Sequence, residues 1–108
     1  MSIKKESLGS GPVGSDKTVW RMKTVIVTGA SRGIGEATVR YLLTRGIRVV
    51  GVARTKARLE LLGMEKIGGG GVFEFVVGDV SERETAADAI RLATSNGHEL
   101  VGLILNAG

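Results

Sequence analysis

The chain has 108 residues, of which 43% are hydrophobic and 24% charged, and its net charge is +4 at neutral pH. This length predicts one small globular domain, and seventeen glycines indicate a fold that depends on many turns. The absence of cysteine excludes disulfides, thiolate catalysis and cysteine metal sites. With only one histidine, a histidine-ligated metal is not expected either.

The positive charge is concentrated near the N-terminus. The first 23 residues hold five basic and two acidic side chains, and the other 85 hold ten basic and nine acidic ones. Such a balanced remainder does not provide the basic face that nucleic-acid binding requires. We therefore expect no nucleic-acid partner.

Residues 1–22 are rich in Gly and Ser and have little apolar periodicity. A segment of this composition cannot bury enough apolar surface to offset the entropy of ordering, so we predict a disordered N-terminal extension followed by one domain over residues 23–108. The extension lacks the apolar region of a secretory signal, and no stretch of the sequence resembles a membrane span. We expect a cytoplasmic protein with no membrane partner.

From Lys23 onward the sequence alternates between strand-like and helix-like patterns. Apolar runs predict strands around 25–27, 48–52, 72–77 and 100–105, the third with both phenylalanines on one face. Helices are predicted at about 33–45, after Thr55 and at about 82–95. Alternating strands and helices require parallel strands with right-handed crossovers, so we predict an α/β fold with a doubly wound parallel sheet.

The helix patterns also predict buried faces. Apolar residues at helical spacing place three side chains of the first helix on one face and three of the last helix on the core side. The second helix is expected to pack through two leucines. These residues are Ile34, Ala37 and Tyr41, then Ala86, Ile90 and Ala93, then Leu59 and Leu62.

Local signals predict the helix ends. Gly46 is a candidate C-terminal cap, and Thr55 is a candidate N-cap. Ser81 and Glu84 have the spacing of a capping box. Glu36 lies four residues before Arg40, which favours an ion pair on the exposed side of the first helix.

The stretch from Val25 to Gly35 combines a buried strand, a glycine turn and the first turn of a helix. Gly29 lets the chain turn sharply, and Gly33 and Gly35 remove side chains where backbone must approach a phosphate or a neighbouring strand. Because a helix N-terminus carries unpaired N–H groups and partial positive charge, this turn predicts a pyrophosphate site. The alternative is a glycine-rich loop with no ligand, but its position between strand and helix favours a nucleotide.

Ligands of open α/β sheets lie beyond the carboxyl ends of the strands. Besides the glycine turn, three segments are predicted to converge at that edge: Ala53–Arg54, Asp79–Val80 and Asn106-Ala107-Gly108.

Together these segments resemble the classical short-chain dehydrogenase/reductase family. Thr28-Gly29-x-x-x-Gly33-x-Gly35 matches its cofactor motif and Asn106-Ala107-Gly108 its Asn-Ala-Gly signature. Gly51–Thr55 is similar, over a shorter stretch, to the fungal benzil-reductase group. The resemblance covers Lys23–Gly108 and implies the N-terminal half of a Rossmann-type domain, truncated after the fourth strand.

The resemblance implies which residues bind the cofactor. Arg54, where NAD-selective folds often have a carboxylate, and Arg32 suit a ribose 2′-phosphate, so NADP(H) is favoured over NAD(H); the alternative is two solvated surface arginines. Asp79 with Val80 is expected at the adenine, although Asp79 could simply end its strand. The other expected cofactor-binding residues are Thr28, Gly29, Ser31, Gly33, Ile34, Gly35, Asn106, Ala107 and Gly108. Thr28 is interpreted as a turn-stabilising hydroxyl rather than a catalyst.

The family's catalytic serine and Tyr-x-x-x-Lys pair follow the Asn-Ala-Gly segment. This sequence has one tyrosine, Tyr41, which we place on the core side of the first helix, and Arg45 stands where a lysine would be required. We therefore predict no catalytic residue in this chain and no metal site.

The resemblance implies the cofactor-binding half of an NADP(H)-dependent oxidoreductase, inactive by itself. The full-length form would act on a ketone, an aldehyde or an alcohol and would form a homo-oligomer. The alternative is a non-catalytic dinucleotide-binding or interaction module. A methyltransferase-type fold fits less well, because it usually has an acidic residue where Arg54 stands.

The last predicted strand, Leu100–Leu105, contains no charged residue. With no further strand beside it, Val101, Leu103, Ile104 and Leu105 would form an unprotected apolar edge. We therefore expect the isolated chain to aggregate or to remain partly unfolded.

Overall fold

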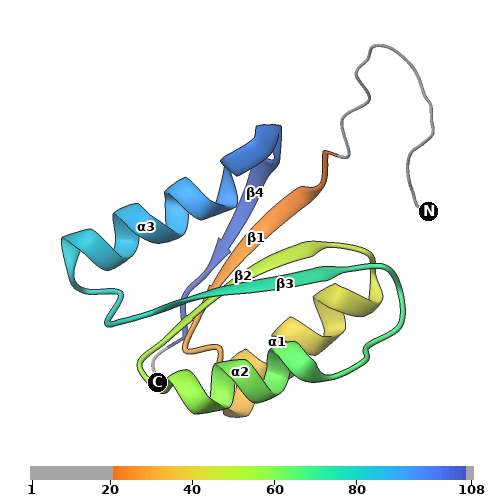
Figure 1. The fold of residues 1–108 in the computed structure, drawn as a ribbon, viewed down its shortest axis with the longest axis horizontal. Coiled ribbons are helices and arrows are strands. Elements are labelled where there is room, and N and C mark those ends of the chain that lie inside the picture. The colour runs from red at the N-terminus through yellow and green to blue at the C-terminus, as the bar shows by residue number, and fades with distance from the viewer. Residues whose placement is uncertain (1–20, 107–108) are drawn as a thin grey trace.

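The computed structural model describes residues 21–106. Its elements alternate as predicted between strands and helices (Figure 1). They are β1 (Lys23–Thr28), α1 (Gly33–Thr44), β2 (Arg48–Ala53), α2 (Lys56–Met64), β3 (Val72–Val77), α3 (Arg83–Ala93), the short 3₁₀ turn η1 (Ser95–Gly97) and β4 (Glu99–Ile104).

The four strands form one parallel sheet of order β3-β2-β1-β4. The chain first winds outward through β2 to β3 and then returns across β1 to place β4 on its other side. Helices α1 and α2 cover one face of the sheet and α3 covers the opposite face (Figure 1). The predicted α/β fold with a doubly wound parallel sheet is therefore confirmed.

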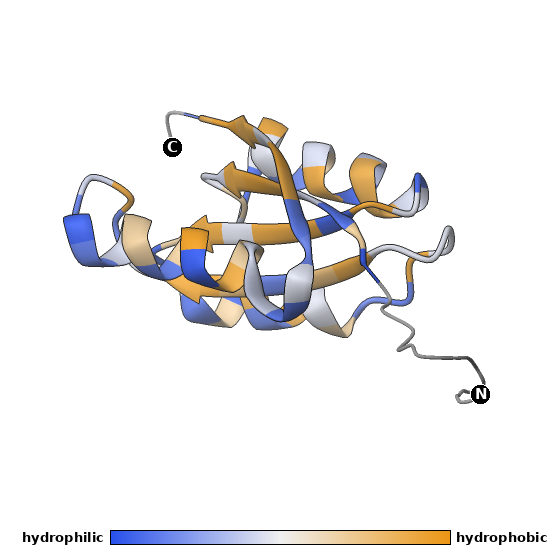
Figure 2. Cartoon of the chain, turned by 90° about the horizontal axis from the view of Figure 1, so that it is seen from above, coloured by the Kyte–Doolittle hydropathy of each residue, from blue (hydrophilic) through white to orange (hydrophobic). Residues whose placement is uncertain are grey.

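Successive residues of β1 and β2 point into different halves of the core. Val27 and Val49 pack beneath α1 and α2, whereas Ile26 and Val50 pack beneath α3. Both strands are therefore buried at nearly every position and carry apolar residues at their centres, as parallel strands covered on both faces do (Figure 2). The two phenylalanines of β3 share the α1–α2 side, as predicted.

The predicted buried face of α1 is wrong. Ile34 is 78% exposed and Tyr41 61% exposed, and Ala37 is also exposed. The side that packs on the sheet instead carries Gly35, Val39 and Leu43. The reason is steric. Gly35, which has no side chain, lies against the backbone of Gly29, and this close approach sets the rotation of the whole helix.

The third helix shows the same preference for small residues at the contact. Thr85, Ala89 and Ala93 are buried, but Ile90 is 52% exposed and Ala86 only half-buried. Of the predicted contact residues, only Ala93 lies fully in the core. In α2 the two predicted leucines, Leu59 and Leu62, are both buried.

Of the predicted caps, Gly46 is confirmed and the two side-chain caps are wrong. The N–H of Gly46 donates to Leu43 (3.1 Å) in the manner of a Schellman cap. Thr55 stands at the N-cap of α2 but makes no side-chain capping bond. The Ser81 hydroxyl donates to Asp79 instead, and α3 begins one residue later than a capping box at Ser81 requires, with Glu82 as its N-cap. The Glu36–Arg40 ion pair is present.

A buried arginine ties the far end of the sheet together. Arg48, at the start of β2, is 2% exposed. Its guanidinium donates to the Thr24 hydroxyl (3.1 Å) and to the carbonyls of Leu92 (3.0 Å) and Ala93 (3.1 Å), and it pairs with Glu74. One cation thus binds three strands and the C-terminal end of α3, where the helix dipole favours positive charge.

Strand β4 contains an irregularity that reverses its faces. Thr24 pairs with Leu100, but the next residue of β1, Val25, pairs with Gly102, so Val101 is an extra residue. Leu100 consequently packs toward α3 and Ile104 toward α1 and α2. Among the four strands β4 lies at an edge, where Val101, Leu103 and Leu105 are 48–69% exposed. Ile104, predicted with them, is half-buried against the core.

The predicted N-terminal extension lies mostly outside the described residues. Within them, the Met22 N–H donates to His98 Nδ1 (3.0 Å) and the Met22 carbonyl accepts the Glu99 N–H (3.1 Å). None of the helices between residues 21 and 106 is long and apolar enough to cross a membrane.

Candidate functional site

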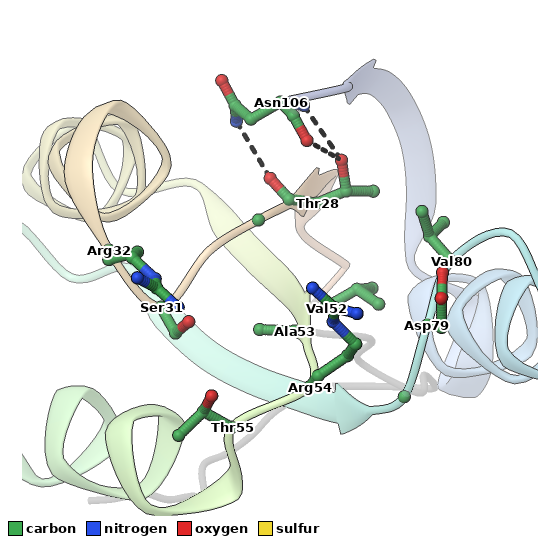
Figure 3. A pocket seen from close by; sticks show the side chains of 12 residues that line it. Thr28, Ser31, Arg32, Val52, Ala53, Arg54, Thr55, Asp79, Val80 and Asn106 are labelled. Carbon is green, nitrogen blue, oxygen red and sulfur yellow. Dashed lines mark hydrogen bonds between the residues drawn. The ribbon is translucent and has the colours of Figure 1, made fainter. Parts of the chain in front are cut away.

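A cavity of about 540 Å³ lies at the carboxyl ends of the strands (Figure 3). This volume falls within the range of ligand pockets, about 300–1,000 Å³. Its walls come from the segments that follow each of the four strands. The lining residues are Thr28, Gly29, Ser31, Arg32, Val52, Ala53, Arg54, Thr55, Gly78, Asp79, Val80 and Asn106.

The glycine turn between β1 and α1 is built on close backbone contacts. Gly29 has φ of +63°, a conformation that favours glycine, and a Cβ there would lie 3.2 Å from the Asn106 carbonyl oxygen. A Cβ on Gly35 would lie 2.0 Å from the carbonyl oxygen of Gly29. By contrast, a Cβ on Gly33 would meet no atom of the described residues within 4 Å, so space is open beside the start of α1.

Hydrogen bonds fix this turn to the neighbouring strand ends. The Ala30 N–H donates to the Val52 carbonyl at 3.2 Å. On the other side, the Thr28 hydroxyl accepts the Asn106 N–H (3.0 Å), and the Asn106 side-chain amide donates to the Thr28 carbonyl (2.9 Å; Figure 3). Thr28 is therefore a structural hydroxyl, as predicted, because its contacts join β1 to the segment after β4.

Two arginines line the cavity from separate elements. Arg54 follows β2 and points into the cavity, and Arg32 lies in the glycine turn (Figure 3). Both are exposed, so their charges are available to a ligand. Arginine suits phosphate because its planar guanidinium donates several hydrogen bonds in a fixed geometry.

Asp79 stands at the far wall, directly after β3. Its carboxylate accepts the N–H of Ser81 (2.9 Å) and the Ser81 hydroxyl (2.8 Å). The Ser81 N–H, then its hydroxyl and then the charge of Arg54 hold the pKa of Asp79 below its usual range. The carboxylate is thus kept ionised and oriented at the mouth of the cavity.

Most of the predicted site residues come together in this cavity, but three of them do not line it. Gly33, Ile34 and Gly35 form the start of α1 and are not part of the lining. Ala107 and Gly108 lie outside the described residues. Three lining residues, Val52, Thr55 and Gly78, were not predicted from the sequence, although all three adjoin predicted strand-end positions.

Tyr41 does not line the cavity. It lies on the exposed side of α1, where its ring centre is 6.0 Å from Cζ of Arg45. Its exposure corrects the expectation that it faces the core. Within residues 21–106 there is no group of three His, Cys, Asp or Glu side chains close enough to hold a metal ion.

A parallel sheet with a glycine turn leading from its first strand into a helix defines a Rossmann-type α/β domain. The chain belongs to the short chain dehydrogenase family, whose sequence profile matches residues 23–108.

Curated relatives and solved structures agree with this assignment. The chain is 39% identical over 88 residues to an uncharacterized oxidoreductase of Saccharomyces cerevisiae, covering 80% of this chain and 34% of that protein. A metagenomic short-chain oxidoreductase solved in complex with NADP has a TM-score of 0.63 and 37% identity, over 80% of this chain and 39% of that one. L-sorbose reductase from Gluconobacter frateurii, complexed with NADPH and L-sorbose, has a TM-score of 0.69 and 30% identity, over 82% of this chain and 34% of that one. The chain spans about a third of the length of the curated relatives that it matches.

Proposed function

We propose that this chain is the cofactor-binding part of an NADP(H)-dependent oxidoreductase that interconverts a ketone or aldehyde with an alcohol. Membership of the short chain dehydrogenase family supports a nicotinamide dinucleotide as the cofactor. The preference for NADP(H) rests on Arg32 and Arg54 lining one cavity with the glycine turn.

The cavity and the start of α1, which follows the lining residue Arg32, fit the parts of such a cofactor. The N-terminus of α1 and the open space at Gly33 suit the pyrophosphate, because helix N–H groups and the helix dipole attract anions. Arg54 and Arg32 would bind the ribose 2′-phosphate, and Asp79 with Val80 would bind the adenine. Ala53 and Arg54 offer no carboxylate for the 2′-hydroxyl that distinguishes NAD(H).

When bound, the nicotinamide supplies or accepts the hydride. The residues of this chain bind and orient the cofactor, and Asn106 holds two strand ends together beneath it. The only tyrosine is Tyr41, which does not line the cavity, and the sequence contains no Tyr-x-x-x-Lys. We therefore expect the 108-residue chain to bind cofactor without turning over a substrate.

Titration with NADPH and NADH, followed by the fluorescence of the reduced nicotinamide, tests this proposal. A charge-assisted contact to the 2′-phosphate contributes about 1.5–3 kcal/mol, and about 1.4 kcal/mol corresponds to a tenfold change in affinity. Arg54→Asp should therefore lower the preference for NADPH at least about tenfold. Lys66→Asp makes the same charge change on an exposed loop residue outside the cavity and should leave the preference unchanged. Equal affinities of the unmutated chain for the two cofactors would refute the NADP(H) assignment.

A further inference from the structure

The glycine turn has a third attachment, to α2. Nε of Arg58 donates a hydrogen bond to the Ser31 carbonyl at 3.0 Å. Arg58 is the third residue of α2, and Ser31 is 8% exposed in the middle of the turn. A side chain of the second helix thus reaches a backbone group of the loop that precedes the first helix.

This bond constrains the peptide group that leads into α1. The described backbone has no cis peptide, so the Ser31 carbonyl and the Arg32 N–H point in opposite directions. Ser31 lines two hollows: the cavity at the strand ends, and a groove of about 220 Å³ between α1 and α2 that Arg58 also lines. Because Arg58 binds the carbonyl from the groove, the Arg32 N–H points away from the groove.

The carboxylates that line the groove are paired with another arginine, so Arg58 stays directed at the Ser31 carbonyl. The carboxylates of Glu36 and Glu65 are both bound by Arg40, whose Nη2 lies 2.5 Å from Glu36 Oε2 and 3.0 Å from Glu65 Oε2. Arg58 does not line the cofactor cavity. Its contact with the site therefore goes through the Ser31 peptide.

We propose that Arg58 is a positioning residue that orients the Ser31–Arg32 peptide, so that the Arg32 N–H faces the phosphates of the dinucleotide. This inference rests on the proposed function and deepens it. Arg54 discriminates between cofactors by their 2′-phosphate, whereas Arg58 affects a part of the site that both share. Loss of Arg58 should therefore weaken the binding of NADH as well as that of NADPH.

Two substitutions separate the hydrogen bond from the charge. In Arg58→Gln the amide nitrogen occupies the same place along the side chain as Nε, so an N–H donor remains without the positive charge. Arg58→Met has a similar length and no donor. With the full 108-residue chain, we expect Arg58→Met to raise the Kd of both cofactors about tenfold and Arg58→Gln to stay within about twofold of the unmutated chain.

An NMR readout in the absence of cofactor makes the test independent of the proposed function. The Arg32 amide resonance should shift in Arg58→Met and stay near its original position in Arg58→Gln. If the unmutated chain binds neither cofactor, the proposed function fails. If the Arg32 amide resonance does not shift in Arg58→Met, the proposed role of Arg58 is overturned, whether or not the chain binds a cofactor.

Two further results would overturn the proposal. One is an Arg58→Met variant that binds both cofactors as tightly as the unmutated chain. The other is a loss of binding in Arg58→Gln as large as in Arg58→Met, because the charge and not the hydrogen bond would then be responsible. If Arg58→Met does not fold, Arg58→Lys replaces it, since its ammonium lies one atom further along the chain. The proposal requires Arg58→Lys to bind more weakly than Arg58→Gln.

Discussion

The closest backbone approach in the site makes Gly35→Ala the most direct test of the structure. A Cβ at Gly35 would lie 2.0 Å from the Gly29 carbonyl oxygen, 2.8 Å from its carbon and 3.3 Å from Cα of Ala30. All three are backbone atoms, so no side-chain rotation relieves the overlap. To restore an ordinary contact of 3.4 Å, α1 must move away from the turn by more than an ångström.

This displacement sets the expected loss of stability. Overpacking of a well-packed core costs about 1–3 kcal/mol, and a rigid backbone obstacle places this site toward the upper end. Alanine recovers about 0.5–1 kcal/mol in a helix relative to glycine. We therefore expect a net loss of about 2 kcal/mol, or about 8–16 °C in Tm for a domain of this size. Cofactor affinity should fall as well, because the helix N-terminus moves.

Thermal and urea unfolding followed by far-UV circular dichroism measure the change in stability. Gly63→Ala is the matched control, because a Cβ there has its nearest neighbour, a carbon of Phe73, at 3.6 Å. Gly63 lies within α2, so the same substitution should stabilise by up to about 0.5–1 kcal/mol. The reasoning would be refuted if both variants had the same stability and Gly35→Ala bound NADPH like the unmutated chain.

Three other outcomes follow from the remaining contacts. Arg48→Met removes the cation that binds three strands and the end of α3; it should cost about 2–4 kcal/mol in urea unfolding, and a loss below about 1 kcal/mol would contradict its bridging role. Folding lowers the pKa of Asp79, so the Asp79 carboxylate contributes its full stabilisation at pH values above the ordinary pKa of 3.8. This stabilisation is lost as the pH falls through the lower pKa of the folded state. Ser81→Ala should move the Asp79 carboxyl titration, followed by NMR, back up; an unchanged titration would exclude the Ser81 hydroxyl as a cause. In size-exclusion chromatography the chain should self-associate as its concentration rises, and Leu103→Lys should reduce this self-association. A monomeric unmutated chain would show that the exposed β4 edge does not pair with other copies.

The sequence by itself determined the order of strands and helices and the location of the candidate site. Apolar β-branched runs of the kind seen in Val25–Val27 occur where a strand is covered on both faces, and alternation with helices makes the strands parallel. Parallel strands bring their carboxyl ends to one edge, so the segments after β1, β2, β3 and β4 had to meet. This is why Arg54, Asp79 and Asn106 could be placed in one site before their distances were known.

Only the tertiary structure decided which way the helices face and how the strand ends are joined. Periodicity favoured Ile34 and Tyr41 as the buried face of α1, but backbone contact at Gly35 turned the helix and left both exposed. No local pattern contains the extra residue at Val101, because it depends on pairing with β1. The bond from Arg58 to Ser31 joins residues 27 positions apart, and the bonds between Thr28 and Asn106 join residues 78 apart. Such contacts arise from packing between distant segments, and propensities within a short window carry no information about them.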